Sequence, residues 1–119
     1  MKNTLAIAIL CLTFTSVVWA APELAQEGSA VYYSDIFQGK PTASGDIFDQ
    51  QAMTAAYKSA PFGTKLKVTN LENGKSVIVI VNDRMASHNR NIIDVSRRAA
   101  QELGFEEQGT ARVSVEPVP

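Results

Sequence analysis

The segment KLKVTNLENGKSVIVIV constrains the fold of this chain more than any other part of the sequence. Apolar and polar residues alternate through residues 65–70, as in a strand with one buried face. Asn73-Gly74 follows, and this dipeptide favours a tight hairpin turn because both residues tolerate positive φ. Residues 76–81 are apolar at nearly every position, which predicts a central strand buried on both faces. A β-sheet must therefore form around this hairpin.

Three more segments have the composition of short strands, namely residues 30–33, 91–95 and 110–116. Two helices are also predicted. Asp49 is placed to cap a helix over residues 50–58. Ser96 is placed to cap a helix over residues 97–103, which Gly104 ends. Strands outnumber helices and the connections are short, so we expect a small, mainly β barrel with two short helices.

The start of the chain has the pattern of a secretory signal. Lys2 gives a short positive region, an apolar run follows to Val18, and Val18 and Ala20 suit a signal-peptidase site. We expect a signal peptide over residues 1–20 with cleavage after Ala20. The apolar run is shorter than the ~20 residues that a spanning helix needs, so no membrane anchor is expected after cleavage.

Cys11 is the only cysteine, and it lies in the middle of the apolar run, directly after Leu10. A lipoprotein signal places its cysteine late in the run and behind a small residue, so lipidation is not expected. The mature chain then has no cysteine, and its stability must come from an apolar core and not from disulfides. We expect an exported protein that is periplasmic or extracellular.

The mature chain divides into three parts. Residues 21–27 form a polar, flexible leader, residues 28–116 form one domain, and residues 117–119 form a proline-containing tail. The formal net charge is −1 and no basic block is present, which argues against nucleic acid or an anionic membrane as a partner. A single histidine argues against a zinc site, and neither a metal nor a cofactor is expected. We expect a monomer.

Asp83 is the first candidate for chemistry. It follows the apolar run 76–81, where a carboxylate is held rigidly and partly desolvated. Desolvation raises the pKa of a carboxyl group towards the range of a general acid. Pairing with Arg84 would act in the opposite direction, and a structural ion pair or turn is the alternative interpretation.

Three other polar residues have weaker signals. Asp94 precedes the start of the second helix, where it accepts backbone donors or serves as a second carboxylate of a site. Asp46 lies in the polar loop TASGD and by itself is typical of a turn. His88 lies in the polar loop ASHNR and is expected to be exposed; whether it reaches a cleft stays open.

Five blocks of the sequence resemble, in the same order, the rare lipoprotein A family. They are GSAVYY, GKPTASGDIFD, MTAAYKSAPFGTKLKVTNLENGK, VIVIVNDR and RNIIDVSRRAAQELG, and they cover nearly all of residues 28–116. The resemblance implies a six-stranded double-psi β-barrel. Active family members are lytic transglycosylases that cut peptidoglycan between N-acetylmuramic acid and N-acetylglucosamine, prefer glycan strands without stem peptides, and leave 1,6-anhydro ends. This chemistry needs a carboxyl group that moves a proton.

The resemblance also assigns roles to residues. Asp83 matches the aspartate of the family's Asp-Arg-Gly motif and is the candidate acid/base, although Met85 replaces the glycine that follows. Asp46 matches a position usually held by glutamate and is a second catalytic candidate. The residues expected to bind substrate are Asp94, which resembles an aspartate in the groove of expansin barrels, Arg84, and Tyr33, which offers a face for stacking on a sugar.

Tyr57 stands where active family members have histidine, and it is the third catalytic candidate. A histidine shares a proton near neutral pH, whereas a tyrosine with a pKa near ~10 donates a hydrogen bond but is a poor base. Three functions therefore stay open. One is a transglycosylase, and another is a barrel that binds glycan strands without cutting them. The third is a protein-interaction or inhibitor barrel.

Overall fold

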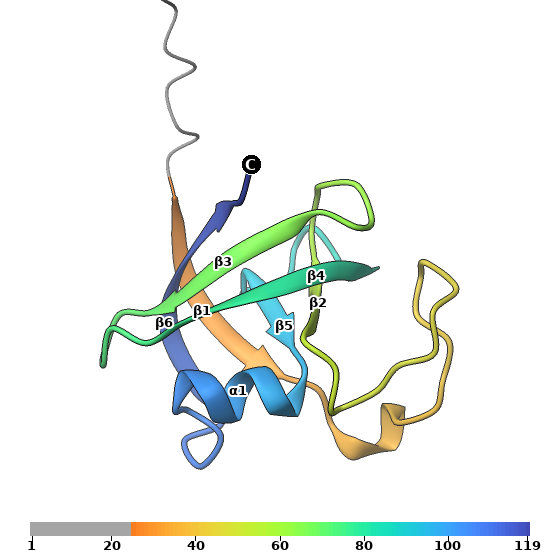
Figure 1. Ribbon diagram of the computed structural model, residues 1–119, viewed down its shortest axis with the longest axis horizontal. Coiled ribbons are helices and arrows are strands. Elements are labelled where there is room, and N and C mark those ends of the chain that lie inside the picture. Colours follow the sequence, from red (N-terminus) through yellow and green to blue (C-terminus); the bar gives the residue numbers. More distant parts are fainter. Residues whose placement is uncertain (1–24) are drawn as a thin grey trace, which may run out of the picture.

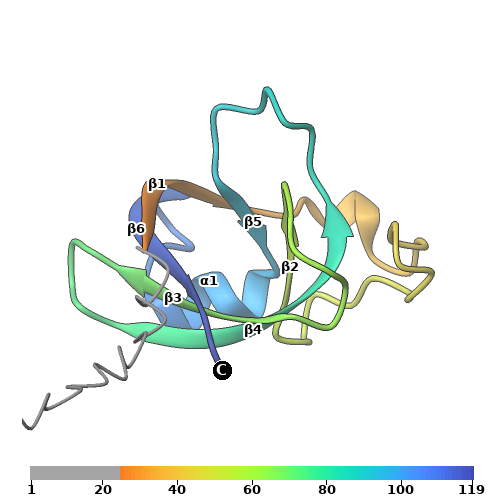
Figure 2. The same ribbon diagram turned by 90° about the horizontal axis from the view of Figure 1, so that it is seen from above.

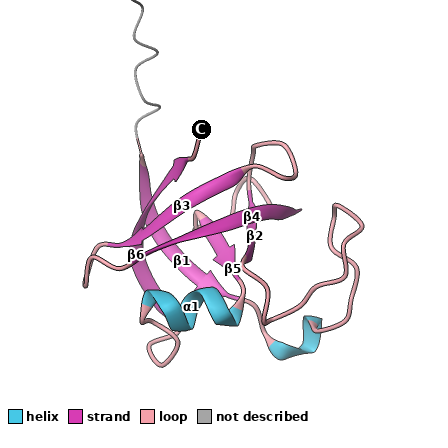
Figure 3. Ribbon diagram, in the orientation of Figure 1, coloured by secondary structure: helices cyan, strands magenta, loops and turns pink. Residues whose placement is uncertain are grey.

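A computed structural model describes residues 25–119, so the predicted signal peptide lies outside the described residues. The elements follow one another along the chain as shown in Figure 1. They are β1 (Gln26–Tyr32), the 3-10 helix η1 (Asp35–Phe37), β2 (Thr54–Tyr57), β3 (Lys65–Asn70), β4 (Ser76–Arg84), β5 (Ile93–Val95), α1 (Arg97–Leu103) and β6 (Thr110–Pro117). Figure 3 shows that strands and loops make up most of this part of the chain.

The six strands close into a barrel in the order β1-β5-β2-β4-β3-β6, which confirms the expected six-stranded barrel. The pairs β1–β5 and β2–β4 are parallel, and the other pairs are antiparallel. Seen from above, the strands form a ring with α1 across the far opening (Figure 2). Closure leaves the central strands no free edge, which protects the sheet from pairing with other chains.

The core lies inside this ring and follows from the alternation along each strand. The inward residues of the long strands are fully or almost fully buried: Leu66 and Val68 on β3, Val79 and Val81 on β4, and Ala111, Val113 and Val115 on β6. The buried face of α1, formed by Ala99, Ala100 and Leu103, closes the same core. Within residues 25–119, no helix combines the length and the apolar composition needed to cross a bilayer.

The prediction that β4 is buried on both faces is wrong. Val79 and Val81 face the core, but Ile78 and Ile80 are 43% and 42% exposed on the outside of the barrel. A barrel strand has one face towards the interior and the other towards solvent or a covering element. An apolar run in this sequence therefore does not indicate a strand that is buried on both faces, since two of its isoleucines are partly exposed.

The prediction of a helix over residues 50–58 is also wrong. Residues Thr54–Tyr57 form β2, which is hydrogen-bonded to β4 on one side and to β5 on the other. Asp49 stabilises only a turn, in which its Oδ1 accepts from the Gln51 amide at 2.9 Å. Pairing with β4 and β5 gives the backbone of residues 54–57 hydrogen-bond partners on both sides. The tertiary structure therefore outweighs the local preference of this segment for a helix.

The second predicted helix is confirmed as α1. Ser96 Oγ accepts from the Ala99 amide at 3.3 Å, and Gly104 ends the helix in a left-handed conformation with φ of 80°. The other helical segment is η1, which the sequence did not predict. The paired strands begin at Gln26 and end at Pro117, slightly beyond the limits predicted for the domain.

Candidate functional site

Two aspartates meet on the outer face of the barrel at Ala56. This residue of β2 pairs with Asp83 on parallel β4 and with Asp94 on antiparallel β5. Residues that pair across neighbouring strands point to the same face of a sheet. Ala56 packs with Tyr33, Phe48 and Met85, in a cluster separate from the barrel core. We call Asp83, Asp94 and the intervening Ala56 the aspartate site.

Three donors orient the half-buried carboxylate of Asp83. The Tyr33 hydroxyl donates to Oδ2 over 2.6 Å, and the amides of Ala43 and Arg84 both donate to Oδ1 over 2.9 Å. Ala43 belongs to the 39–48 loop, which is drawn in yellow beside the end of β4 in Figure 1. The next amide, that of Ser44, donates to the Asn82 carbonyl at 3.2 Å, so this loop is anchored to β4 at the site.

Tyr33 is almost fully buried at the end of β1. Its ring stacks on Phe48 with centroids 4.1 Å apart and meets the edge of Phe37 at 5.9 Å. Burial is the main cause that raises the pKa of Tyr33 well above its ordinary value, followed by the hydrogen bond to Asp83 and the charges of Asp83 and Asp94. The phenol therefore stays protonated and acts as a permanent donor. The expected stacking of Tyr33 on a sugar stays a prediction.

Asp94 has a different environment from Asp83. Burial, and then the negative charge of Asp83, raise the pKa of Asp94 from 3.8 to about 6. Its Oδ1 is buried and has no hydrogen-bond partner among residues 25–119. The N-cap of α1 is Ser96 and not Asp94. Asp94 is thus a carboxyl group that takes up a proton close to neutral pH.

Arg84 points away from Asp83. Its guanidinium donates to the carbonyls of Tyr57 at 3.3 Å and Ala60 at 2.8 Å, and lies 4.6 Å from the centre of the Phe62 ring. No ion pair joins Arg84 to Asp83 in the described part of the chain, so the alternative of a structural ion pair is not formed. Arg84 instead clamps the turn after β2, and its predicted contact with substrate stays a prediction.

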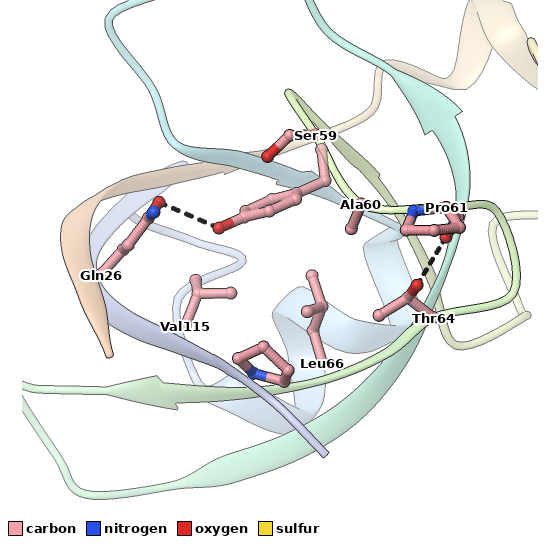
Figure 4. A pocket seen from close by; sticks show the side chains of 9 residues that line it. Gln26, Ser59, Ala60, Pro61, Thr64, Leu66 and Val115 are labelled. Atoms are coloured by element: carbon pink, nitrogen blue, oxygen red, sulfur yellow. Dashed lines mark hydrogen bonds between the residues drawn. The ribbon is translucent and has the colours of Figure 1, made fainter. Parts of the chain in front are cut away.

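Tyr57 lies next to Ala56 but faces the opposite side of β2. It belongs to the barrel core, and its hydroxyl donates to Gln26 Oε1 at 3.0 Å (Figure 4). There it lines a cavity of about 390 Å³ whose walls include Leu66 and Val115. The structure therefore does not bring the Tyr57 phenol and the Asp83 carboxylate to one face.

The two remaining candidates are exposed. Asp46 lies on the 39–48 loop, where its carbonyl accepts from the Thr42 amide at 2.7 Å. His88 lies in the loop between β4 and β5, which projects from the barrel in Figure 2. No group of three histidine, cysteine, aspartate or glutamate side chains suited to a metal ion occurs within residues 25–119.

The contacts that orient Asp83 were not foreseen from the sequence. Tyr33 and Ala43 lie 50 and 40 positions before Asp83, and neither occurs in a local pattern that points to it. The only signal was the position of Asp83 at the end of an apolar strand, which predicted a rigid carboxylate but not its donors.

Comparison with known protein families shows to which family this chain belongs. The model of the family described as lytic transglycolase matches residues 25–115, which include every residue of the aspartate site. This chain belongs to that family. The lytic transglycolase family thus accounts for both the barrel and the order of the five sequence blocks, and the resemblance to rare lipoprotein A is confirmed.

Relatives within the lytic transglycolase family are similar over most of this chain. The endolytic peptidoglycan transglycosylase RlpA of Neisseria meningitidis serogroup B is 50% identical over 81% of this chain and 40% of its own length. The protein of that name from Pseudomonas aeruginosa is 50% identical over 76% of this chain and 27% of its own length. The probable endolytic peptidoglycan transglycosylase RlpA of Treponema pallidum is 45% identical over 96% of this chain and 36% of its own length. The chain therefore spans well under half the length of these relatives.

Solved structures share the barrel of this chain. An expansin from Clavibacter michiganensis superposes with a TM-score of 0.63 and 27% identity, covering 80% of this chain and 50% of the expansin. A papain inhibitor from Streptomyces superposes with a TM-score of 0.66 and 23% identity, covering 83% of this chain and 98% of the inhibitor. Proteins with such different names share the fold, so function has to be argued from the site.

Proposed function

We propose that this protein is an exported lytic transglycosylase that cuts peptidoglycan between N-acetylmuramic acid and N-acetylglucosamine and leaves 1,6-anhydro ends. The observation that carries the proposal is the pair Asp83 and Asp94, which flank Ala56 on one outer face of the barrel. One carboxylate is held by three donors, and the other takes up a proton near neutral pH. The names of the family and of its relatives support the same chemistry.

The reaction needs one proton and one stabilised cation. A carboxylic acid protonates the glycosidic oxygen, and the bond from C1 of the muramic acid to that oxygen breaks. The positive charge that develops at C1 is stabilised by a nearby carboxylate. The C6 hydroxyl then bonds to C1 and returns its proton to the conjugate base, so no water is consumed. Asp83 is the acid/base candidate that the family resemblance assigns, and Asp94 supplies the second carboxyl group.

The position of Tyr57 supports the enzyme over the binding protein. The departure from the family histidine was the main argument for a barrel without activity. In this structure the Tyr57 phenol faces the cavity beside Gln26 and not the aspartate site. The replacement therefore leaves the hydrogen bonds of Asp83 and the environment of Asp94 intact.

A non-catalytic glycan-binding barrel is the second candidate, and Met85 favours it. The family's motif has glycine at this position, whereas Met85 is buried in the cluster beside Ala56 and reduces the space next to the two carboxyl groups. Phe37 and Ile47 are exposed nearby, at 43% and 60%, and offer apolar contact to sugar rings. Under either proposal the protein acts outside the cytoplasm, as a monomer without cofactor, on strands without stem peptides.

Glycan strands stripped of stem peptides provide the test. The purified protein is incubated with them, and mass spectrometry detects 1,6-anhydromuramic ends. We expect products from the wild type, their loss in Asp83→Asn and Asp94→Asn, and their retention in Glu102→Gln, an exposed carboxyl on α1. Binding of glycan strands without products from the wild type would favour the second candidate.

A further inference from the structure

Tyr33 contacts the one oxygen of Asp83 that is left with room for a substrate. A carboxylate oxygen accepts about two hydrogen bonds. Oδ1 already accepts from the amides of Ala43 and Arg84, whereas among residues 25–119 Oδ2 accepts only from Tyr33. The hydroxyl of Tyr33 therefore acts on the oxygen that keeps an acceptor site for a further donor.

The phenol oxygen is held in place by the rest of Tyr33. The ring stacks on Phe48 with an interplanar angle of 15°. The backbone amide donates to the Val95 carbonyl at 3.0 Å, and the backbone carbonyl accepts from Gln50 Nε2 at 2.7 Å. Phe48 therefore holds the Tyr33 ring, and Val95 and Gln50 hold its backbone. These contacts fix the position of the hydroxyl that donates to Asp83.

A donor bonded to a carboxylate favours its charged form over its protonated form. Since Tyr33 stays protonated, it donates to Asp83 throughout the working pH range. The Tyr33 hydroxyl therefore occupies an acceptor site of Asp83 Oδ2. The buried Oδ1 of Asp94 has no such donor among residues 25–119.

Among residues 25–119, two titratable groups lie close to Asp94. Asp83 lies across from it on β4, and Tyr33 lies at the end of β1. The two strands paired with β5 place uncharged residues beside Asp94, Val31 on β1 and Ala56 on β2. The nearby charge that acts on Asp94 is therefore that of Asp83, and it favours a protonated Asp94.

We propose that Tyr33 is a positioning residue that keeps Asp83 as an oriented carboxylate, so that Asp94 carries the proton used in cleavage. This inference rests on the proposed function and reverses the roles that the family resemblance suggests, because it gives the acid/base role to Asp94 and not to Asp83. Asp94 gives its proton to the glycosidic oxygen, and the electron pair of the C1–O bond goes to that oxygen. Asp83 stabilises the cation at C1. The C6 oxygen then bonds to C1, and its proton returns to Asp94. Tyr33 exchanges no proton.

The chain offers a matched control for Tyr33→Phe. Tyr32 also donates one hydrogen bond through its hydroxyl, to the Glu106 carbonyl at 2.9 Å, but away from the aspartate site. In Tyr33→Phe we expect kcat/KM for denuded strands to fall roughly tenfold or more, as for loss of a charge-assisted hydrogen bond. We also expect the pH dependence of its kcat/KM to differ from that of the wild type, because the variant loses the donor to Asp83 Oδ2. Tyr32→Phe should keep the wild-type profile.

A second measurement separates the roles of the two aspartates. A glycan ending in a nitrophenyl leaving group needs little help from an acid, because the phenolate departs without a proton. On this substrate Asp94→Asn should recover most of its activity, and Asp83→Asn should stay inactive. Recovery in Asp83→Asn instead would reverse the roles and overturn the proposal.

A third measurement needs no activity. Carboxyl carbon NMR should show Asp94 titrating near pH 6 in the wild type and in Tyr32→Phe. In Tyr33→Phe the titration of Asp94 should move, because loss of the donor frees the Asp83 carboxylate that acts on it. Identical titrations in Tyr33→Phe and the wild type would refute the positioning role. Wild-type protein that titrates as expected but forms no anhydro ends would refute the proposed function alone.

Discussion

The carboxyl groups of Asp83 and Asp94 lie on opposite sides of Ala56, one on a parallel and the other on an antiparallel neighbour of β2. A register shift between Ala55 and Ala56 places Ala56 opposite Asp83 instead of Asn82. A bulge re-aims side chains locally, and such irregularities are frequent beside functional sites. The pairing thus puts two carboxyl groups on one face, and the charge of Asp83 adds to burial in raising the pKa of Asp94.

The cost of this arrangement predicts how stability depends on pH. Burial of Asp94 raises its pKa in the folded state from 3.8 to about 6. The folded state therefore binds more protons than the unfolded state between these values, and the contribution of Asp94 to stability falls as pH rises through this window. Asp94→Asn removes a penalty on the order of 2–3 kcal/mol at pH 7.5.

Urea unfolding at two pH values measures this effect. We expect Asp94→Asn to be more stable than the wild type at pH 7.5 and to lose this advantage near pH 3.8. Asp35→Asn is the control, since Asp35 is an exposed carboxyl in an ion pair with Arg97. An advantage of Asp94→Asn that is the same at both pH values would contradict the assignment.

Arg84 is predicted to stabilise the turn after β2. Lysine at this position cannot reach both the Tyr57 and Ala60 carbonyls or stack a planar group on Phe62. We expect Arg84→Lys to lower the free energy of unfolding by about 1–2 kcal/mol. Chemical denaturation checks this, and Arg112→Lys serves as the control, because the exposed pair of Arg112 with Glu27 contributes little. Equal effects of the two substitutions would disprove the clamp.

The same turn contains a strained residue. Ala60 has a φ of 88°, in the left-handed region that glycine adopts readily. We expect Ala60→Gly to raise the free energy of unfolding by about 0.5–1 kcal/mol. Gly63 has a φ of 91°, and no atom lies within 4 Å of an added methyl group. Gly63→Ala should therefore lower the free energy of unfolding by a similar amount, through backbone strain alone. Thermal unfolding of both variants measures the pair, and shifts in the same direction would exclude backbone strain as the cause.

Tyr57→His tests the departure from the family pattern directly. Because the Tyr57 ring faces the Gln26 cavity, we expect the rate of anhydro-end formation to stay near that of the parent protein. The same mass-spectrometric assay applies, with Asp83→Asn as the inactive reference. A gain of activity would show that the phenol limits catalysis and that the residue at this position acts on the reaction.

Local features of the chain could be read from the sequence because they depend on near neighbours. The hairpin of β3 and β4 follows from alternation and Asn73-Gly74, and α1 follows from its cap at Ser96 and its stop at Gly104. Asp83 was recognisable at the end of an apolar strand. Each of these signals lies within a few residues, so no knowledge of distant parts was needed.

The tertiary structure alone decided which faces and which distant residues meet. Residues 54–57 form a strand and not the predicted helix, because β4 and β5 hydrogen-bond to both edges of that segment, and these partners follow it in the chain. Closure of the barrel put Ile78 and Ile80 outside and Tyr57 inside. It also brought Tyr33 to Asp83 across 50 positions. The sequence by itself determined the β3–β4 hairpin, α1 and the position of Asp83, because their signals are local. The pairing of strands in space determined that Asp83 receives three hydrogen bonds and that Asp94 is buried beside it.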